Sequence, residues 1–151
     1  MIFRRRDELA IRSRCDDADL SVLFSSERTF KVWRYGVGHS QLLLRADPEP
    51  SHPKRLDLLF EGVEAMQLVT RYGALELHMF DEAESGRILE MSGVPARWRS
   101  TRLVLGLRSR SGAGYVQCQK VSALLGGAAV VGPEEPSESI EVIWSLRGDV
   151  A

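Results

Sequence analysis

The three histidines, His39, His52 and His78, are the side chains best suited to acid–base or metal chemistry near neutral pH. No two of them have the spacing that would put two metal ligands on one strand or helix. His78 precedes Asp81 and Glu82, and a turn there could gather an imidazole and two carboxylates. A solvent-facing strand histidine beside two loop acids explains the same pattern. We therefore predict no metal site and no cofactor.

A serine motif points to a second kind of chemistry. Gly38-His39-Ser40-Gln41 matches the first four positions of the G-x-S-x-G turn that carries the nucleophile of serine hydrolases. The fifth position is Leu42, where that turn needs glycine, and 42–44 is typical of a strand instead of the helix that must follow. We expect a hairpin in which His39 and Ser40 bond to local backbone, and we predict no catalytic residue.

Two alternatives keep a function open for other residues. The first is a small-ligand binder or enzyme, with a pocket lined by His39, His78 and nearby acids. It requires the two histidines to converge. The second is single-stranded nucleic acid binding through Arg97-Trp98-Arg99 and Arg102, because bases stack on aromatic rings and phosphates pair with arginine. The net charge of -1 and the pI of about 6.3 do not favour nucleic acid as the partner. The same tryptophan and arginines also suit a protein-binding hot spot.

These candidates must be positioned by strands, because apolar residues recur with a period of two along most of the chain. The segment 29–37 has apolar groups on both faces, with Phe30 and Val32 on one and Trp33, Tyr35 and Val37 on the other. One face therefore remains to be covered by something outside the core. Such a face, and the open edges of a sheet, favour association with another chain.

The segments that alternate in this way predict an all-β fold, an antiparallel β-sandwich or flattened barrel of about 8 to 10 short strands with little helix. The predicted strands are 20–24, 29–37, 41–46, 55–61, 63–70, 75–79, 102–108, 115–121 and 140–144, with a turn and a short strand over 123–131. Tyr72-Gly73 is predicted as a turn. We expect 55–61, 63–70 and 75–79 to pair in order as an antiparallel meander.

Length and composition predict one globular β-rich domain over residues 1–151, with an arm or short helix at 1–19 and a tail at 146–151. Hydrophobic residues make up 44% and charged residues 27%, which is ordinary for a globular protein. No signal peptide or membrane span is visible, so we expect a cytoplasmic protein that does not bind membranes. We also expect reduced cysteines, with Cys118 buried in a strand and Cys15 unpaired.

Two stretches, Gly38-His39-Ser40-Gln41-Leu42-Leu43-Leu44-Arg45 and Leu59-Phe60-Glu61-Gly62-Val63, resemble small uncharacterised bacterial β-rich proteins. Some proteins of that kind lie beside toxin genes as immunity partners, so the resemblance implies protein binding and no activity. Our leading expectation is a non-enzymatic module that binds another protein or its own copy. The residues expected to contact a ligand or partner are Trp33, Tyr35, His39, His78, Trp98 and Arg99.

Overall fold

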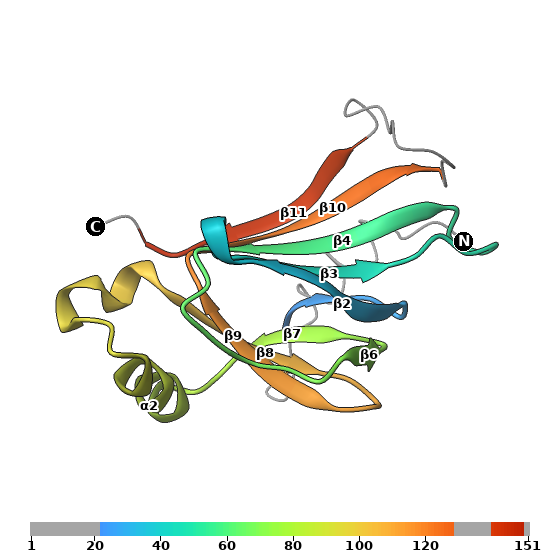
Figure 1. Cartoon of the computed structure of the whole chain (residues 1–151). Helices are drawn as coiled ribbons and strands as arrows, with labels where there is room; N and C mark the ends of the chain where they lie inside the picture. The colour runs from blue at the N-terminus through green and yellow to red at the C-terminus, as the bar shows by residue number, and fades with distance from the viewer. Residues whose placement is uncertain (1–21, 129–139, 150–151) are drawn as a thin grey trace.

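The computed structural model describes residues 22–128 and 140–149, which form eleven strands in two antiparallel sheets (Figure 1). The five-stranded sheet has the order β1 (Val22–Ser25), β7 (Glu76–Met79), β8 (Leu103–Arg108), β9 (Ala113–Cys118) and β5 (Ala65–Gln67). The six-stranded sheet has the order β11 (Glu141–Arg147), β10 (Lys120–Ala128), β4 (Lys54–Glu61), β3 (Gln41–Ala46), β2 (Thr29–Gly36) and β6 (Arg71–Gly73). The predicted all-β sandwich is confirmed, and the described strands do not close into a barrel.

The core lies between the two sheets and follows the period-two pattern of the sequence. Leu56, Leu58 and Phe60, which occur at every second position of β4, are fully buried. Each large apolar side chain buried in this way stabilises the fold by about 1.5–3 kcal/mol. Trp144 of β11 packs on Phe24 of β1, with ring centroids 5.2 Å apart. β1 and β11 are edge strands of different sheets, so this contact joins the two sheets along one side.

The chain passes from one sheet to the other at a corner beside Gly62 and Gln119. Gly62 has φ 68°, a left-handed conformation that favours glycine, and a Cβ there would lie 3.0 Å from the Gln119 side chain. The Gln119 N–H donates to the Glu61 carbonyl at 2.9 Å. The predicted meander is therefore wrong: β4 belongs to the six-stranded sheet, and β5 lies in the other sheet with β9 and β8 between it and β7. Figure 1 shows the sheets diverging from this corner.

The predicted turn at Tyr72-Gly73 is also wrong, because these residues belong to β6. Phe30 pairs with Tyr72 and Lys31 with Arg71, so β6 extends the six-stranded sheet beyond β2. The Tyr72 ring is fully buried, and its hydroxyl accepts a hydrogen bond from the Val69 N–H at 3.0 Å. The chain turns after β6, at Ala74, whose φ is 60°.

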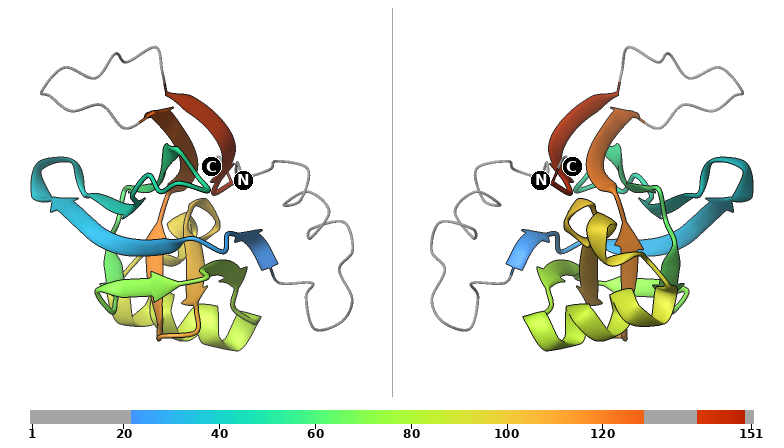
Figure 2. Two further views of the ribbon diagram at one scale, coloured as in Figure 1. Left: turned by 90° about the vertical axis from the view of Figure 1, so that its right-hand side faces the viewer. Right: turned by 90° about the vertical axis from the view of Figure 1, so that its left-hand side faces the viewer.

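A helix, α2 (Glu82–Ser92), occupies a stretch in which the sequence predicted no strand. The Asp81 carboxylate accepts from the Glu84 N–H at 2.8 Å, and Gly93 ends the helix at φ 79°. Ile88 is its one fully buried residue, so the helix has only a weak apolar stripe for a sequence to reveal. Figure 2 shows α2 lying across the molecule on the side away from β10 and β11.

The predicted boundaries at the chain ends change as well. β11 continues to Arg147, and the Gly148 N–H donates to the Gln119 carbonyl at 3.0 Å, so residues 146–148 are part of the fold and not of a tail. β10 runs through 120–128 without the turn expected inside 123–131. The predicted arm at 1–19, and Cys15 within it, lie outside the described residues.

Candidate functional site

The edge of β2 is covered over only the first half of its length. β6 pairs with Thr29, Phe30 and Lys31, and the Val32 N–H donates to the Thr70 carbonyl at 3.0 Å. Within 22–128 and 140–149, no strand pairs with Trp33–Gly36 on that side, although β3 pairs with β2 along the other. Backbone N–H and C=O groups along such an edge are a template for an added strand.

The open edge carries large apolar side chains. The exposed fractions are 49% for Trp33, 38% for Tyr35 and 79% for Val37, the last in the short helix η1 (Val37–His39). The pairing register of β2 with β3 shifts between Val32 and Arg34, which makes Trp33 the extra residue of a β-bulge. Bulges turn a side chain away from the position that regular pairing would give it. Trp33, Tyr35 and Val37 are exposed, as expected, but the prediction that they share one face is wrong, because after the bulge Tyr35 is paired with the core residue Leu42.

The Trp33 ring is held by cations from its own strand and the next. The Arg45 guanidinium carbon lies 4.7 Å from the ring centroid, and Lys31 Nζ lies 5.2 Å from it. Arg45 is fixed by two hydrogen bonds to Asp57 of β4, from Nε to Oδ1 at 2.9 Å and from Nη2 to Oδ2 at 3.1 Å. Arg55 Nε donates to the same carboxylate at 3.2 Å. Together Trp33, Lys31, Arg45, Arg55 and Asp57 form what we call the Trp33 cluster.

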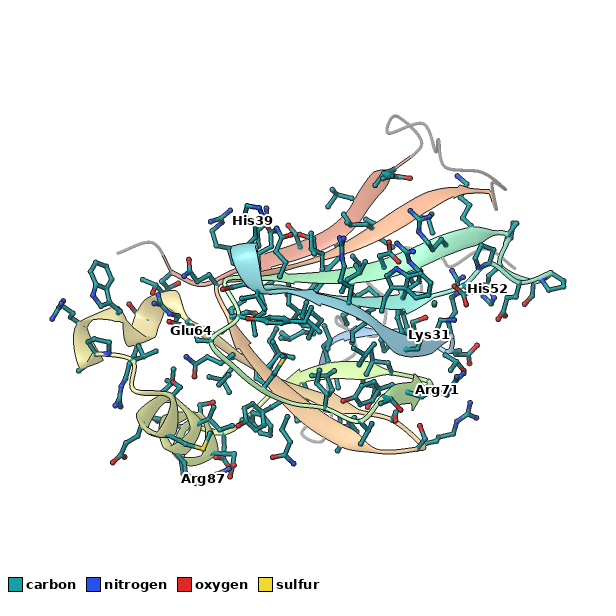
Figure 3. The ribbon with its side chains drawn as sticks, in the orientation of Figure 1. Lys31, His39, His52, Glu64, Arg71 and Arg87 are labelled. Carbon is teal, nitrogen blue, oxygen red and sulfur yellow. The ribbon has the colours of Figure 1, made fainter. Side chains whose placement is uncertain are left out.

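The surroundings of the open edge are basic. Lys31 of β2 is paired in register with Arg71 of β6, and Figure 3 shows both side chains at the same end of the molecule. Lys31 forms an ion pair with Asp47 at 2.6 Å. Arg34 and Arg71 are exposed and form no ion pair with any residue that the structure describes. This local positive charge contrasts with the net charge of -1 of the whole chain.

His78 is a packing residue. Its ring lies against Gly106 of β8, where an added Cβ would come within 2.2 Å of the imidazole Cε1. It also makes an edge contact with Phe80, at 5.1 Å between centroids, and His78 Nδ1 lies 3.2 Å from the Met79 carbonyl oxygen. Burial lowers the pKa of His78 below its usual 6.5, so the neutral ring is favoured.

His39 does not join His78 at a common site. It is exposed in η1, which links two strands of the six-stranded sheet (Figure 3). His78 lies on β7, in the five-stranded sheet. His52 is held in the loop before β4 by Glu49, with Nδ1 to Oε1 at 3.0 Å. Ser40 leads into strand β3 and not into a helix, as the sequence predicted. Among the described residues, no three His, Cys, Asp or Glu side chains form a group able to hold a metal ion.

The basic cluster around Trp98 is only partly available. Trp98 lies in the short helix η2 (Ala96–Thr101) and is 41% exposed, with the Arg97 guanidinium 5.7 Å from its ring centroid. Arg102 is occupied by Glu64, donating from Nε at 2.5 Å and from Nη2 at 3.1 Å. The Nε of Arg99 is buried and without a hydrogen-bond partner. The ion pair removes one of the cations that nucleic acid binding would use.

Gln117 forms a polar network that the sequence did not reveal. Its side chain is fully buried, accepts from Ser92 Oγ at 2.8 Å, and donates to Glu64 Oε1 at 3.1 Å. The end of α2 is thereby connected to β9 and to the Glu64–Arg102 pair. Partial burial raises the pKa of Glu64, but the hydrogen bonds from Arg102 and Gln117 outweigh it, so the net pKa lies below 4.5.

Arg28 is a second buried polar residue. Its Nη2 donates to the carbonyls of Ala46 at 3.3 Å and Asp47 at 2.9 Å, which ties the start of β2 to the end of β3. Nε and Nη1 are buried without a hydrogen-bond partner. Desolvation lowers the pKa of Arg28, and the nearby carboxylates of Glu49 and Asp47 act in the opposite direction. The charged Arg28 guanidinium is therefore stabilised by the two carbonyl groups and by the nearby carboxylates.

Comparison with known proteins gives no family: no family model matches the chain, and neither a curated protein nor a solved structure is similar to it. The resemblance to small bacterial β-rich proteins therefore stays a prediction. Among the described helices, none has the length and apolar character needed to cross a bilayer.

Proposed function

We propose that this chain is a non-enzymatic protein-binding module in which the open edge of β2 accepts an extended segment of another polypeptide. The observation that carries the proposal is the mismatch between β2 and β6. β2 has eight residues and β6 has three, so Trp33–Gly36 offers main-chain donors and acceptors beside exposed aromatic rings. Strand addition uses such an edge for affinity and adjacent side chains for specificity.

The side chains at the edge suit an anchor. Tryptophan and tyrosine dominate binding hot spots, and Trp33 and Tyr35 lie two residues apart on the exposed segment. The Trp33 cluster fixes one of these rings before any partner arrives, because Arg45 is itself held by Asp57. A preorganised anchor loses less side-chain entropy on binding than a free one.

The other candidate groups support a binding role more than a catalytic one. His78 is packed on Gly106 and His52 is bonded within its loop, so both have structural work in the fold. We include a bacterial, cytoplasmic setting in the proposal. It is supported by the arginine-rich composition and by the free, buried Cys118, which suits a reducing compartment.

The test compares two tryptophans that are similarly exposed but lie on different elements. Partners captured by the full chain are identified, purified and titrated against wild type, Trp33→Ala and Trp98→Ala, while sedimentation velocity measures self-association. We expect Trp33→Ala to weaken the complex at least tenfold, which corresponds to about 1.4 kcal/mol. Loss of binding with Trp98→Ala alone would move the interface to η2. The proposal would be contradicted if the protein is a monomer and if neither Trp33→Ala nor Trp98→Ala changes the affinity for the captured partners.

A further inference from the structure

The alternation of β2 bears on the chemistry of the strand that it would receive. We infer that the added strand belongs to a different protein and alternates acidic with apolar residues, with an acidic side chain beside Arg34, the cation of the open segment. This inference rests on the proposed function and makes it more specific. It follows from the pairing register, the charges at the edge and the open main-chain groups.

The register decides which side chains of an added strand meet which residues of β2. Tyr35 is paired with Leu42, which is fully buried, so this position of the sheet has the core-facing parity. Arg34 pairs with Leu43 and therefore belongs to the opposite, outward face. In an antiparallel added strand, the residue opposite Arg34 faces outward beside its guanidinium. The next residue, opposite Tyr35, faces the phenol ring.

The outward positions select a negative charge. Lys31 and Arg34 lie on β2, Arg71 follows on β6, and within the Trp33 cluster Asp57 already accepts from two arginines. Asp47 is the acid paired with Lys31. Among the residues that the structure describes, cations therefore outnumber carboxylates at this edge. Opposite charges directly across two strands are favourable and like charges are unfavourable, so acidic residues suit the outward positions.

The inward positions select apolar side chains. Val32 is partly buried and packs against the core, and Tyr35 remains 38% exposed beyond it. A valine, isoleucine or aromatic residue of the added strand, on the same face of the sheet as Tyr35, would cover the exposed part of the Tyr35 ring. The added strand therefore alternates, with its acidic residues on the outward face and its apolar residues on the face toward the core. This alternation is the period of two that is typical of a strand with one buried face.

A second copy of this chain fits the edge less well than such a partner. If β2 paired with β2 of a second copy, the contact would be two-fold symmetric. The basic edge of one copy would then face the same basic edge of the other, with the two Arg34 side chains near each other. Nucleic acid would satisfy the charges but would leave the N–H and C=O groups of Trp33–Gly36 without the alternating partners that a peptide backbone supplies.

The probe is a pair of acetylated, amidated eight-residue peptides, one alternating glutamate and valine and the other lysine and valine. Each is titrated against the full chain by isothermal titration calorimetry. We expect the glutamate peptide to bind at least tenfold more tightly than the lysine peptide, and to weaken as salt is raised. Arg34→Glu should reverse this preference. Arg87→Glu, on exposed α2 away from the edge (Figure 3), should leave it unchanged.

A second pair of glutamate peptides tests the main chain. Each is N-methylated on every other residue, one set on odd positions and one on even. Strand addition predicts that one set binds like the unmethylated peptide and the other loses at least tenfold in affinity, because alternate N–H groups point toward β2. Equal binding of both sets would overturn the strand geometry.

The outcomes separate the two proposals. Equal affinity for glutamate and lysine peptides, or failure of the glutamate peptide to bind, overturns the inferred partner chemistry. A partner whose affinity depends on Trp33 would still uphold protein binding. If sedimentation shows a dimer that is lost in Trp33→Ala, the occupant is a second copy, and the inference of a different acidic partner is wrong.

Discussion

The guanidinium of Arg45 lies 4.7 Å from the centroid of the Trp33 ring, so a cation from β3 holds the exposed aromatic of β2. The arginine is itself oriented by the Asp57 carboxylate of β4, at 2.9 and 3.1 Å. Three neighbouring strands thus contribute one residue each to the placement of a single ring. This arrangement makes Asp57, although it is buried below the surface, a positioning residue for the proposed binding edge.

Asp57→Asn is expected to lower the free energy of unfolding by about 2 kcal/mol. Asp57 is buried and accepts from Arg45 and Arg55, and hydrogen bonds to charged groups contribute about 1.5–3 kcal/mol where they are shielded from water. Urea denaturation at pH 7 measures the loss. Since Arg45 also loses its orientation, binding of a Trp33-dependent partner should weaken in the folded variant.

The control for Asp57 is Glu76→Gln, which breaks the exposed pair with Arg108 at 2.9 Å. Both partners of that pair are in water, so the change should cost less than about 0.5 kcal/mol. Equal effects of the two substitutions would mean that burial does not strengthen the Asp57 interactions. The role given to Asp57 would then have to be abandoned.

Trp33→Ala and Trp144→Ala should separate binding from stability. Trp33 is half exposed, so its removal should change the free energy of unfolding by less than about 1 kcal/mol. Trp144 packs on Phe24 where β11 meets β1, and its loss should cost about 2–3 kcal/mol. Thermal and urea unfolding of both variants give the comparison. A strongly destabilised Trp33→Ala would show that this ring is a core residue.

The strands that could be predicted from the sequence are those with one clear apolar face. Leu56, Leu58 and Phe60 occur at every second position of β4, and the structure buries all three. β3 also has the predicted bounds, Gln41–Ala46. Here a period of two is sufficient, because each side chain has only one favourable side of the sheet.

The sequence failed where a distant residue decides the local structure. The left-handed Gly62 becomes a corner only because Gln119 lies against it, and these two residues are far apart in the chain. The open edge of β2 likewise depends on β6 being too short to cover it. No local pattern reveals the Ser92–Gln117–Glu64 network, whose three members come from separate elements. Exposure of Trp33 and Tyr35 was predictable, but their place at an open edge was not.

Gly106→Ala is expected to destabilise the fold by about 1–3 kcal/mol, because its methyl group would overlap the His78 ring. Replacing that ring should recover much of the loss, so His78→Ala combined with Gly106→Ala forms a double-mutant cycle with a clear coupling energy. Urea unfolding of the four proteins measures it. Additive effects in the cycle would show that the two residues do not contact each other.

Gly86→Ala serves as the opposite case. Gly86 lies inside α2, and a Cβ there meets nothing within 4 Å. Alanine should therefore stabilise the protein by about 0.5–1 kcal/mol through its helix propensity. The same unfolding experiment applies. A loss of stability in Gly86→Ala would mean that this face of α2 is covered.

The Glu64 carboxyl predicts a dependence of stability on pH. Partial burial raises its pKa, but hydrogen bonds from Arg102 and Gln117 bring the folded value below the usual 4.5. Its contribution to stability is therefore complete above pH 4.5 and is lost as the pH falls through the lower folded pKa. The free energies of unfolding of wild type and Glu64→Gln should differ by about 1 kcal/mol at pH 7 and should converge as the pH falls through the folded pKa of Glu64, which lies below 4.5. A constant difference across this range would contradict the assignment.

Cys118 should be unreactive until the protein unfolds. Burial in β9 raises the pKa of its thiol to about 12, so the thiolate that attacks an aromatic disulfide reagent is scarce at pH 8 and has no access to it. In a Cys15→Ser background, labelling should appear only as urea populates open states, and its rate should follow the free energy of unfolding. Val37→Cys in a chain without the native cysteines is the exposed control, since Val37 is 79% exposed. Fast labelling of Cys118 in native buffer would mean that the corner beside Gln119 opens independently of the rest of the sandwich.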